Sequence, residues 1–156
     1  MNRLALLLLA AAACGSDANV AGNYTVAITN KDNGCSIGNW MVGAQPMATA
    51  TVMQDGSKVK LTVNGFAGVA VSGLLGTSQF DGEVSGNDIS LEVIGTVPNA
   101  TGNCTYTYNS TLDATQDGDV MTGRVHYRAA TNGGTDCGSR TGCVSFQDFN
   151  ATRPPS

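Results

Sequence analysis

The stretch TYTYNSTLDATQDGDVMTGRVHY, residues 105–127, decides the fold class. Apolar or small residues alternate with polar ones on both sides of its centre, at Tyr106, Tyr108, Ser110, Leu112 and then at Met121, Gly123, Val125, Tyr127. A period of two is typical of a strand with one buried face. The central Asp117-Gly118-Asp119 is typical of a tight turn, because glycine accepts a positive φ at little cost. The stretch therefore predicts an antiparallel hairpin.

The same alternation recurs along the chain and predicts eight one-sided strands with no helix pattern among them. The other six begin near Tyr24, Ala48, Val59, Phe80, Ile89 and Val144. This arrangement predicts an all-β fold, a single antiparallel up-and-down meander that closes into an eight-stranded barrel with its apolar face inward; a β-sandwich is the alternative. Closure is favoured because it leaves no exposed strand edge.

The connections between these strands alternate in length. Tight-turn signals occur at 55–57, 85–87 and 117–119, whereas about 30–47, 65–76, 95–103 and 130–142 are long. Successive connections of a meander fall at opposite ends, so all the long loops are predicted to share one end. The apolar, glycine-rich loop 65–76 is interpreted as a ninth short strand or a plug over the barrel mouth, or as a mobile lid or contact surface.

Five cysteines are an odd number, and setting Cys14 apart leaves Cys35, Cys104, Cys137 and Cys143 for two disulfides. Three pairings are open, of which we expect Cys137–Cys143 and Cys35–Cys104. Zinc is disfavoured because the chain has no Cys-x-x-Cys pair and the lone His126 has no partner at ligand spacing. No metal and no cofactor are therefore expected.

The N-terminus has the pattern of an export signal, with Arg3, an apolar run from Leu4 to Ala13, and then Cys14. It resembles the lipobox of bacterial lipoproteins. The resemblance implies that residues 1–13 are a removed signal peptide, that Cys14 is lipidated, that 14–22 form a short tether and that 23–156 form the barrel. By that family's sorting rule, Gly15 implies a lipid anchor in the bacterial outer membrane; a secreted or periplasmic protein is the alternative.

The strand pattern is also similar to lipocalin-like and avidin-like barrels, which implies a carrier of a small apolar molecule. All four tyrosines fall on the inward face, opposite small residues. They either fill the core or frame a cavity, and we favour a filled core. The candidate contact residues for a ligand or a partner are Trp40, Phe66, Leu74, Leu75, Tyr106, Tyr108 and Tyr127.

The formal net charge is −4, so nucleic acid is not an expected partner. No motif of a nucleophile elbow, a zinc protease or a phosphate-binding loop occurs in the sequence. Asp81 and Glu83 share one face of a predicted strand, but that face is the outer one. An enzyme is therefore not expected.

We accordingly expect an exported, lipid-anchored β-barrel of the cell envelope that acts as a binding or structural surface module. Its partners would be the membrane, through the N-terminal lipid, and a small apolar ligand or an envelope protein. The first alternative is a lipocalin-like carrier of a small apolar ligand. The second is a hydrolase that uses Asp81 and Glu83.

The intact mass of the protein extracted from its own membrane, before reduction, tests the anchor. We expect a chain that starts at Cys14, carries acyl groups and lacks four thiol hydrogens. A mature chain without acyl groups would contradict lipidation.

Overall fold

The structure is a computed structural model that describes residues 16–155. The predicted signal peptide and Cys14 lie outside the described residues, so lipidation of Cys14 stays a prediction.

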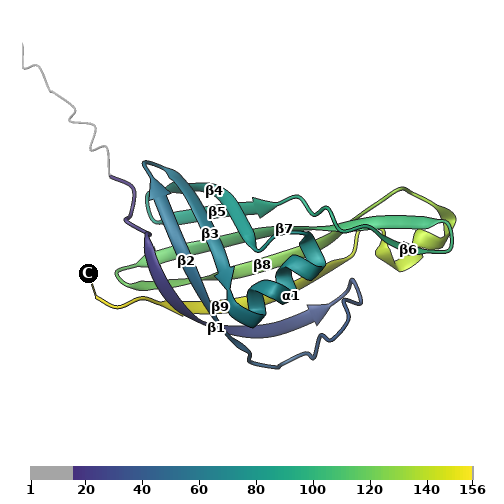
Figure 1. Ribbon diagram of the computed structural model, residues 1–156, viewed down its shortest axis with the longest axis horizontal. Coiled ribbons are helices and arrows are strands. Elements are labelled where there is room, and N and C mark those ends of the chain that lie inside the picture. Colours follow the sequence, from purple (N-terminus) through teal and green to yellow (C-terminus); the bar gives the residue numbers. More distant parts are fainter. Residues whose placement is uncertain (1–15, 156) are drawn as a thin grey trace, which may run out of the picture.

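The chain folds into a closed antiparallel barrel of eight strands, as predicted (Figure 1). The barrel strands are β1 (Gly22–Asn33), β2 (Met47–Asp55), β3 (Lys58–Asn64), β4 (Gln79–Ser85), β5 (Asp88–Val93), β7 (Cys104–Asp117), β8 (Val120–Thr131) and β9 (Val144–Thr152). Each pairs with its neighbour in sequence, and β5 pairs with β7. A short additional strand, β6 (Asn99–Thr101), pairs with β7 beyond the end of β5.

The first and last strands close the barrel. β1 pairs with β9 over Thr25–Asn33, with Val26 opposite Ala151 and Ile28 opposite Phe149. The register shifts between Asn30 and Asn33, where a bulge bends the strand. Every barrel strand therefore has a partner on both sides, and the edges that a sandwich would expose are absent from the barrel.

The predicted alternation places the apolar face inside. In β7, every second residue from Cys104 to Gln116 is buried, and the residues between them point outward. The end of the barrel near the tight turns is filled by large buried side chains: Tyr24, Val52, Phe80, Ile89, Leu91, Leu112 and Met121. This filled end anchors the fold, since full burial of one such side chain contributes about 1.5–3 kcal/mol.

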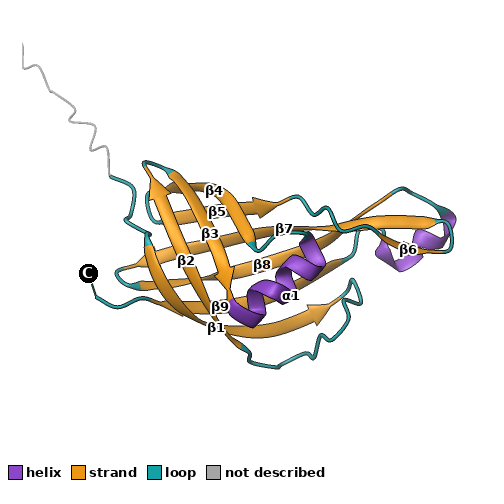
Figure 2. Cartoon of the chain, viewed as in Figure 1, coloured by secondary structure: helices purple, strands orange, loops and turns teal. Residues whose placement is uncertain are grey.

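The two ends of the barrel differ as the loop lengths predict (Figure 2). The tight turns contain Gly56, Gly86 and Gly118, each with φ near +60°, and they lie at one end together with both described termini. There the backbone N–H of Ala18 donates to Gly86, and that of Arg153 donates to Asp119. We call this the closed end. The long connections lie at the opposite end, the mouth.

The interpretation of residues 65–76 as a ninth short strand is wrong, since the chain contains two helices that the sequence pattern did not indicate. Residues Gly65–Leu75 form helix α1, and Thr135–Arg140 form a short 3-10 helix, η1. The run 65–75 lacks the two-residue alternation of a strand, and Gly76 ends the helix in the left-handed conformation at φ 91°. No helix among residues 16–155 has the length and apolar character needed to cross a membrane.

Two disulfides are present, but the predicted pairing is wrong. Cys35 bonds Cys143 and Cys104 bonds Cys137. Cys35 follows β1 and Cys143 precedes β9, and these two strands are neighbours only because the barrel closes. Proximity in sequence between Cys137 and Cys143 therefore does not decide the pairing.

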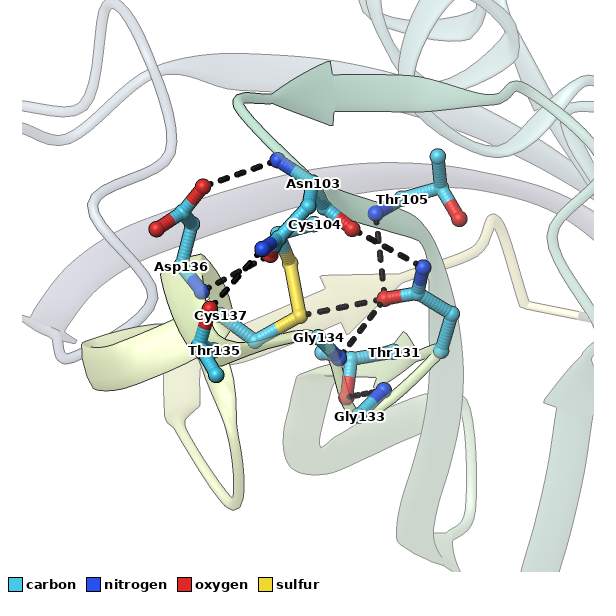
Figure 3. Close-up of a disulfide and its surroundings, with 10 residues drawn as sticks. Asn103, Cys104, Thr105, Thr131, Gly133, Gly134, Thr135, Asp136 and Cys137 are labelled. Carbon is cyan, nitrogen blue, oxygen red and sulfur yellow. Dashed lines mark hydrogen bonds between the residues drawn. A yellow bond between two sulfur atoms is a disulfide. The ribbon is translucent and has the colours of Figure 1, made fainter.

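Beyond the end of β5, β7 and β8 continue as a hairpin that carries β6 and η1 (Figure 1). The Cys104–Cys137 disulfide fastens η1 to the start of β7, as Figure 3 shows. Beside it, the backbone N–H of Asn103 donates to Asp136 Oδ2 at 2.8 Å, and the backbone N–H of Asp136 donates to Asn103 Oδ1 at 2.9 Å. These reciprocal bonds order a segment that has little apolar core of its own.

The close contact between β4 and β5 at Gly82 can be tested by substitution. A Cβ at Gly82 would lie 2.1 Å from the backbone oxygen of Ser90, so Gly82→Ala should destabilise the protein by about 1–3 kcal/mol. Gly73→Ala is the matched control, because nothing lies within 4 Å of its Cβ position and alanine favours a helix by about 0.5–1 kcal/mol. In denaturant unfolding, the free energy of unfolding should fall in Gly82→Ala and rise in Gly73→Ala. Equal changes in the two variants would contradict the close packing at Gly82.

Candidate functional site

The mouth half of the barrel contains a cavity of about 1060 Å³ that is open to solvent on one side. The inward side chains of β1, β2, β3, β8 and β9 form its walls, and α1 covers it. Inward residues at this level, such as Val26, Ile28, Val63 and Val125, are only partly buried. Their remaining accessible surface faces the cavity. The expectation of a filled core is therefore correct for the closed end and wrong for the mouth half.

Small side chains leave this volume empty. Ala48 and Ala50 of β2 and Ala151 of β9 face inward, and α1 presents Ala67 and Ala70 to the same space. A barrel of eight strands is wide enough for side chains to fill or for one small ligand to occupy. Because these positions are alanine, side chains from opposite walls do not meet, and the volume between them stays empty.

Helix α1 lies across the mouth because two residues bind it closely to the barrel (Figure 2). Gly68 approaches β3 so closely that a Cβ there would lie 2.2 Å from the backbone oxygen of Val63. Leu75 is fully buried at the other end of the helix, and its carbonyl accepts a hydrogen bond from Thr96. Val71 and Leu74 then line the cavity from above.

The loop 34–46 forms the other side of the mouth. Its first residues are held to β9 by the Cys35–Cys143 disulfide. Trp40 donates from Nε1 to the Lys31 carbonyl at 2.8 Å, and its ring meets that of Tyr127 edge to face at 5.8 Å between centroids. Trp40 therefore lies in the cavity wall in a fixed orientation, as the only tryptophan of the chain.

A chain of three polar side chains crosses the wall near this loop. Tyr127 donates to Gln147 Oε1 at 3.0 Å, Gln147 Nε2 donates to Asn30 Oδ1 at 2.7 Å, and Asn30 Nδ2 donates to the Met41 carbonyl at 3.2 Å. Burial raises the pKa of Tyr127, so its hydroxyl stays neutral. These groups satisfy one another's hydrogen bonds, as buried polar groups must.

The structure places the sequence-predicted contact residues in three environments. Trp40, Phe66, Leu74 and Tyr127 line the cavity. Leu75, the last residue of α1, is fully buried. Tyr106 and Tyr108 lie outside the cavity, where Arg140 of η1 stacks over the ring of Tyr106 and donates to the Tyr108 hydroxyl.

Sequence reasoning found Phe66 and Leu74 of α1 but missed the helix itself, its cavity residues Ala67, Ala70 and Val71, and the Tyr127–Gln147–Asn30 chain. The helix had one local signal, the glycine at its C-terminal end. The polar chain had none, because Asn30 lies in β1 and Gln147 in β9, and only barrel closure brings them together.

Exposed apolar side chains surround the mouth. Phe66 is 90% exposed and Met47 is 63% exposed, although both also contribute to the lining of the cavity. Val69 on the outer side of α1 is 69% exposed. The helix has Ser72 as its single polar side chain and no charged one, so an apolar surface continues from outside the barrel into the cavity.

The carboxylates of the hydrolase alternative lie on the outer face of the barrel. Asp81 and Glu83 are exposed and border a shallow surface depression beside the β2–β3 turn. Asp81 pairs with Lys60 at 3.1 Å, and hydrogen bonds from Gln79 and Lys60 hold the pKa of Asp81 below its usual value. A glycosidase acid needs a raised pKa, so Asp81 does not fit the role of the acid.

No group of three or more metal-ligating side chains occurs among the described residues. Comparison of the chain with protein-family models, with curated proteins and with solved structures found no match. Function is therefore inferred from the geometry of the cavity.

His126 lies on the outer face of β8, between Arg124 and Arg128. Burial lowers the pKa of His126 below its ordinary value of 6.5, and the two arginines lower it further. Because the unfolded chain then binds a proton more readily than the folded chain, stability should be complete above about pH 6.5 and decrease as the pH falls below it.

The variant His126→Gln should lose this part of the pH dependence. Denaturant unfolding of both proteins between about pH 5 and pH 7 measures it. If the unfolding free energy of the variant changes with pH as steeply as that of the wild type, other groups cause the pH dependence.

Proposed function

We propose that the protein binds a small apolar molecule inside the barrel, as a carrier or receptor of the cell envelope. The proposal rests on the cavity of about 1060 Å³ beneath α1. Ligand pockets typically have volumes of about 300–1,000 Å³ and predominantly apolar walls. This cavity lies at the upper limit of that range, and its walls are predominantly apolar.

The energetics support an apolar ligand. A ligand that buries roughly 400 Å² of apolar surface gains about 10 kcal/mol before the costs of association. Much of the cavity wall is already in place, because strands, the disulfide Cys35–Cys143 and the Trp40 hydrogen bond hold it. Little ordering of the protein is then needed on binding.

The exposed apolar residues at the mouth support access from that side. Phe66 and Met47 lead from the surface into the cavity, between α1 and the start of β2. The closed end offers no comparable route, since its inward side chains are fully packed. A ligand would accordingly enter past α1.

We further propose that the protein works outside the cytoplasm, tethered through a lipid on Cys14. Two disulfides support an oxidising compartment. Residues of the proposed tether itself contact the closed end, where Asp17 accepts a hydrogen bond from the Gly86 backbone at 2.9 Å. A membrane anchor would then hold the closed end and leave the mouth directed away from that membrane.

The variant Ala48→Phe tests whether the ligand occupies the cavity. Ala48 faces inward from β2, so a phenyl ring there would occupy part of the empty volume. Titration with the uncharged dye Nile red should show saturable binding to the wild-type protein and at least roughly tenfold weaker binding to the variant.

The matched control is Ala27→Phe, on the exposed outer face of β1. It adds the same ring without reaching the cavity and should bind Nile red as the wild type does. Equal loss in both variants, or no loss in either, would place the dye elsewhere. Circular dichroism and thermal unfolding confirm that each variant is folded.

A further inference from the structure

The proposed function leaves the charge of the apolar ligand unspecified. The residues that line the cavity indicate what that charge is. No residue with a charged side chain lines the cavity within residues 16–155. Its polar lining consists of amide and hydroxyl side chains, together with backbone groups. A charged group brought into such a space loses its hydration and gains no counter-ion.

Of the charged side chains around this half of the barrel, Arg140 of η1 donates to the Cys35 carbonyl and to the Tyr108 hydroxyl, outside the cavity. Lys31 and Arg124 both pair with Asp148 on the outer face, at 3.5 Å and 2.6 Å. Arg153 lies 5.8 Å from the ring centre of Tyr24 and pairs with Asp119 at 2.9 Å. None of these side chains lines the cavity.

Ionisation of the wall itself does not supply a charge either. Tyr24 and Tyr127 line the cavity, and burial raises the pKa of each hydroxyl above its ordinary value of 10.0. Both hydroxyls therefore remain neutral at physiological pH, and an anionic or a cationic ligand finds only dipoles.

The polar chain across the wall is suited to a neutral polar group. Tyr127, Gln147 and Asn30 offer hydroxyl and amide groups that both donate and accept. An alcohol, ester or amide of a ligand can exchange one hydrogen bond with this chain without leaving a charge unpaired.

From this lining we infer that the cavity selects electrically neutral ligands, namely long-chain alcohols, esters or amides, and discriminates against the corresponding carboxylates. The inference depends on the proposed function, because it specifies the ligand of the same cavity.

The experiment compares decan-1-ol with decanoate, which share a hydrocarbon chain and differ in charge. The emission of Trp40, the single tryptophan in the cavity wall, is followed during titration of the full chain at about pH 8, where a carboxylic acid is ionised. We expect decan-1-ol to bind at least roughly tenfold more tightly than decanoate. Ala48→Phe should weaken decan-1-ol binding, and Ala27→Phe should not.

A second titration varies the charge on one ligand. As the pH falls toward the carboxyl pKa, decanoic acid becomes neutral, and its apparent affinity should rise while that of decan-1-ol stays constant. Equal affinities at about pH 8, or tighter binding of decanoate, would overturn the inference and leave the proposed function intact. Failure of both ligands to bind would overturn the inference together with the proposed function.

Discussion

The pairing of β1 with β9 is the interaction on which the rest of the structure depends. It joins the two ends of the meander, removes the exposed edges of the barrel and encloses the core. It also sets Cys35 beside Cys143 and Asn30 beside Gln147, pairs that are more than a hundred residues apart in sequence. The disulfide that holds the mouth loop and the polar chain in the cavity wall both follow from this one closure.

The barrel is filled at one end and hollow at the other because side-chain size changes along the strands. At the closed end, Phe80, Ile89 and Leu91 of the neighbouring strands β4 and β5 are almost fully buried and exclude solvent. Toward the mouth, alanines on β2 and on α1 leave a space that no side chain reaches. Packing is thus concentrated at one end, and the proposed ligand would occupy the other.

The polarity of the mouth half is consistent with that division. Among residues 16–155, no charged side chain lines the cavity, and the wall contains neutral dipoles that bond one another. Such a wall is stable while empty, since no buried charge needs a ligand to neutralise it. It therefore favours a ligand whose binding depends on apolar contact and shape.

The sequence by itself determined the strands, their inward faces, the antiparallel meander and the separation of tight turns from long connections. Alternation and turn residues are local signals that a single chain carries. Helix α1 was missed because its apolar run has no alternation, and only packing of Gly68 and Leu75 against the barrel gives it a stable place. The disulfide pairing and the cavity were decided by tertiary structure alone. Both depend on which distant strands become neighbours and on the volume left between them, and neither quantity is encoded in a local pattern.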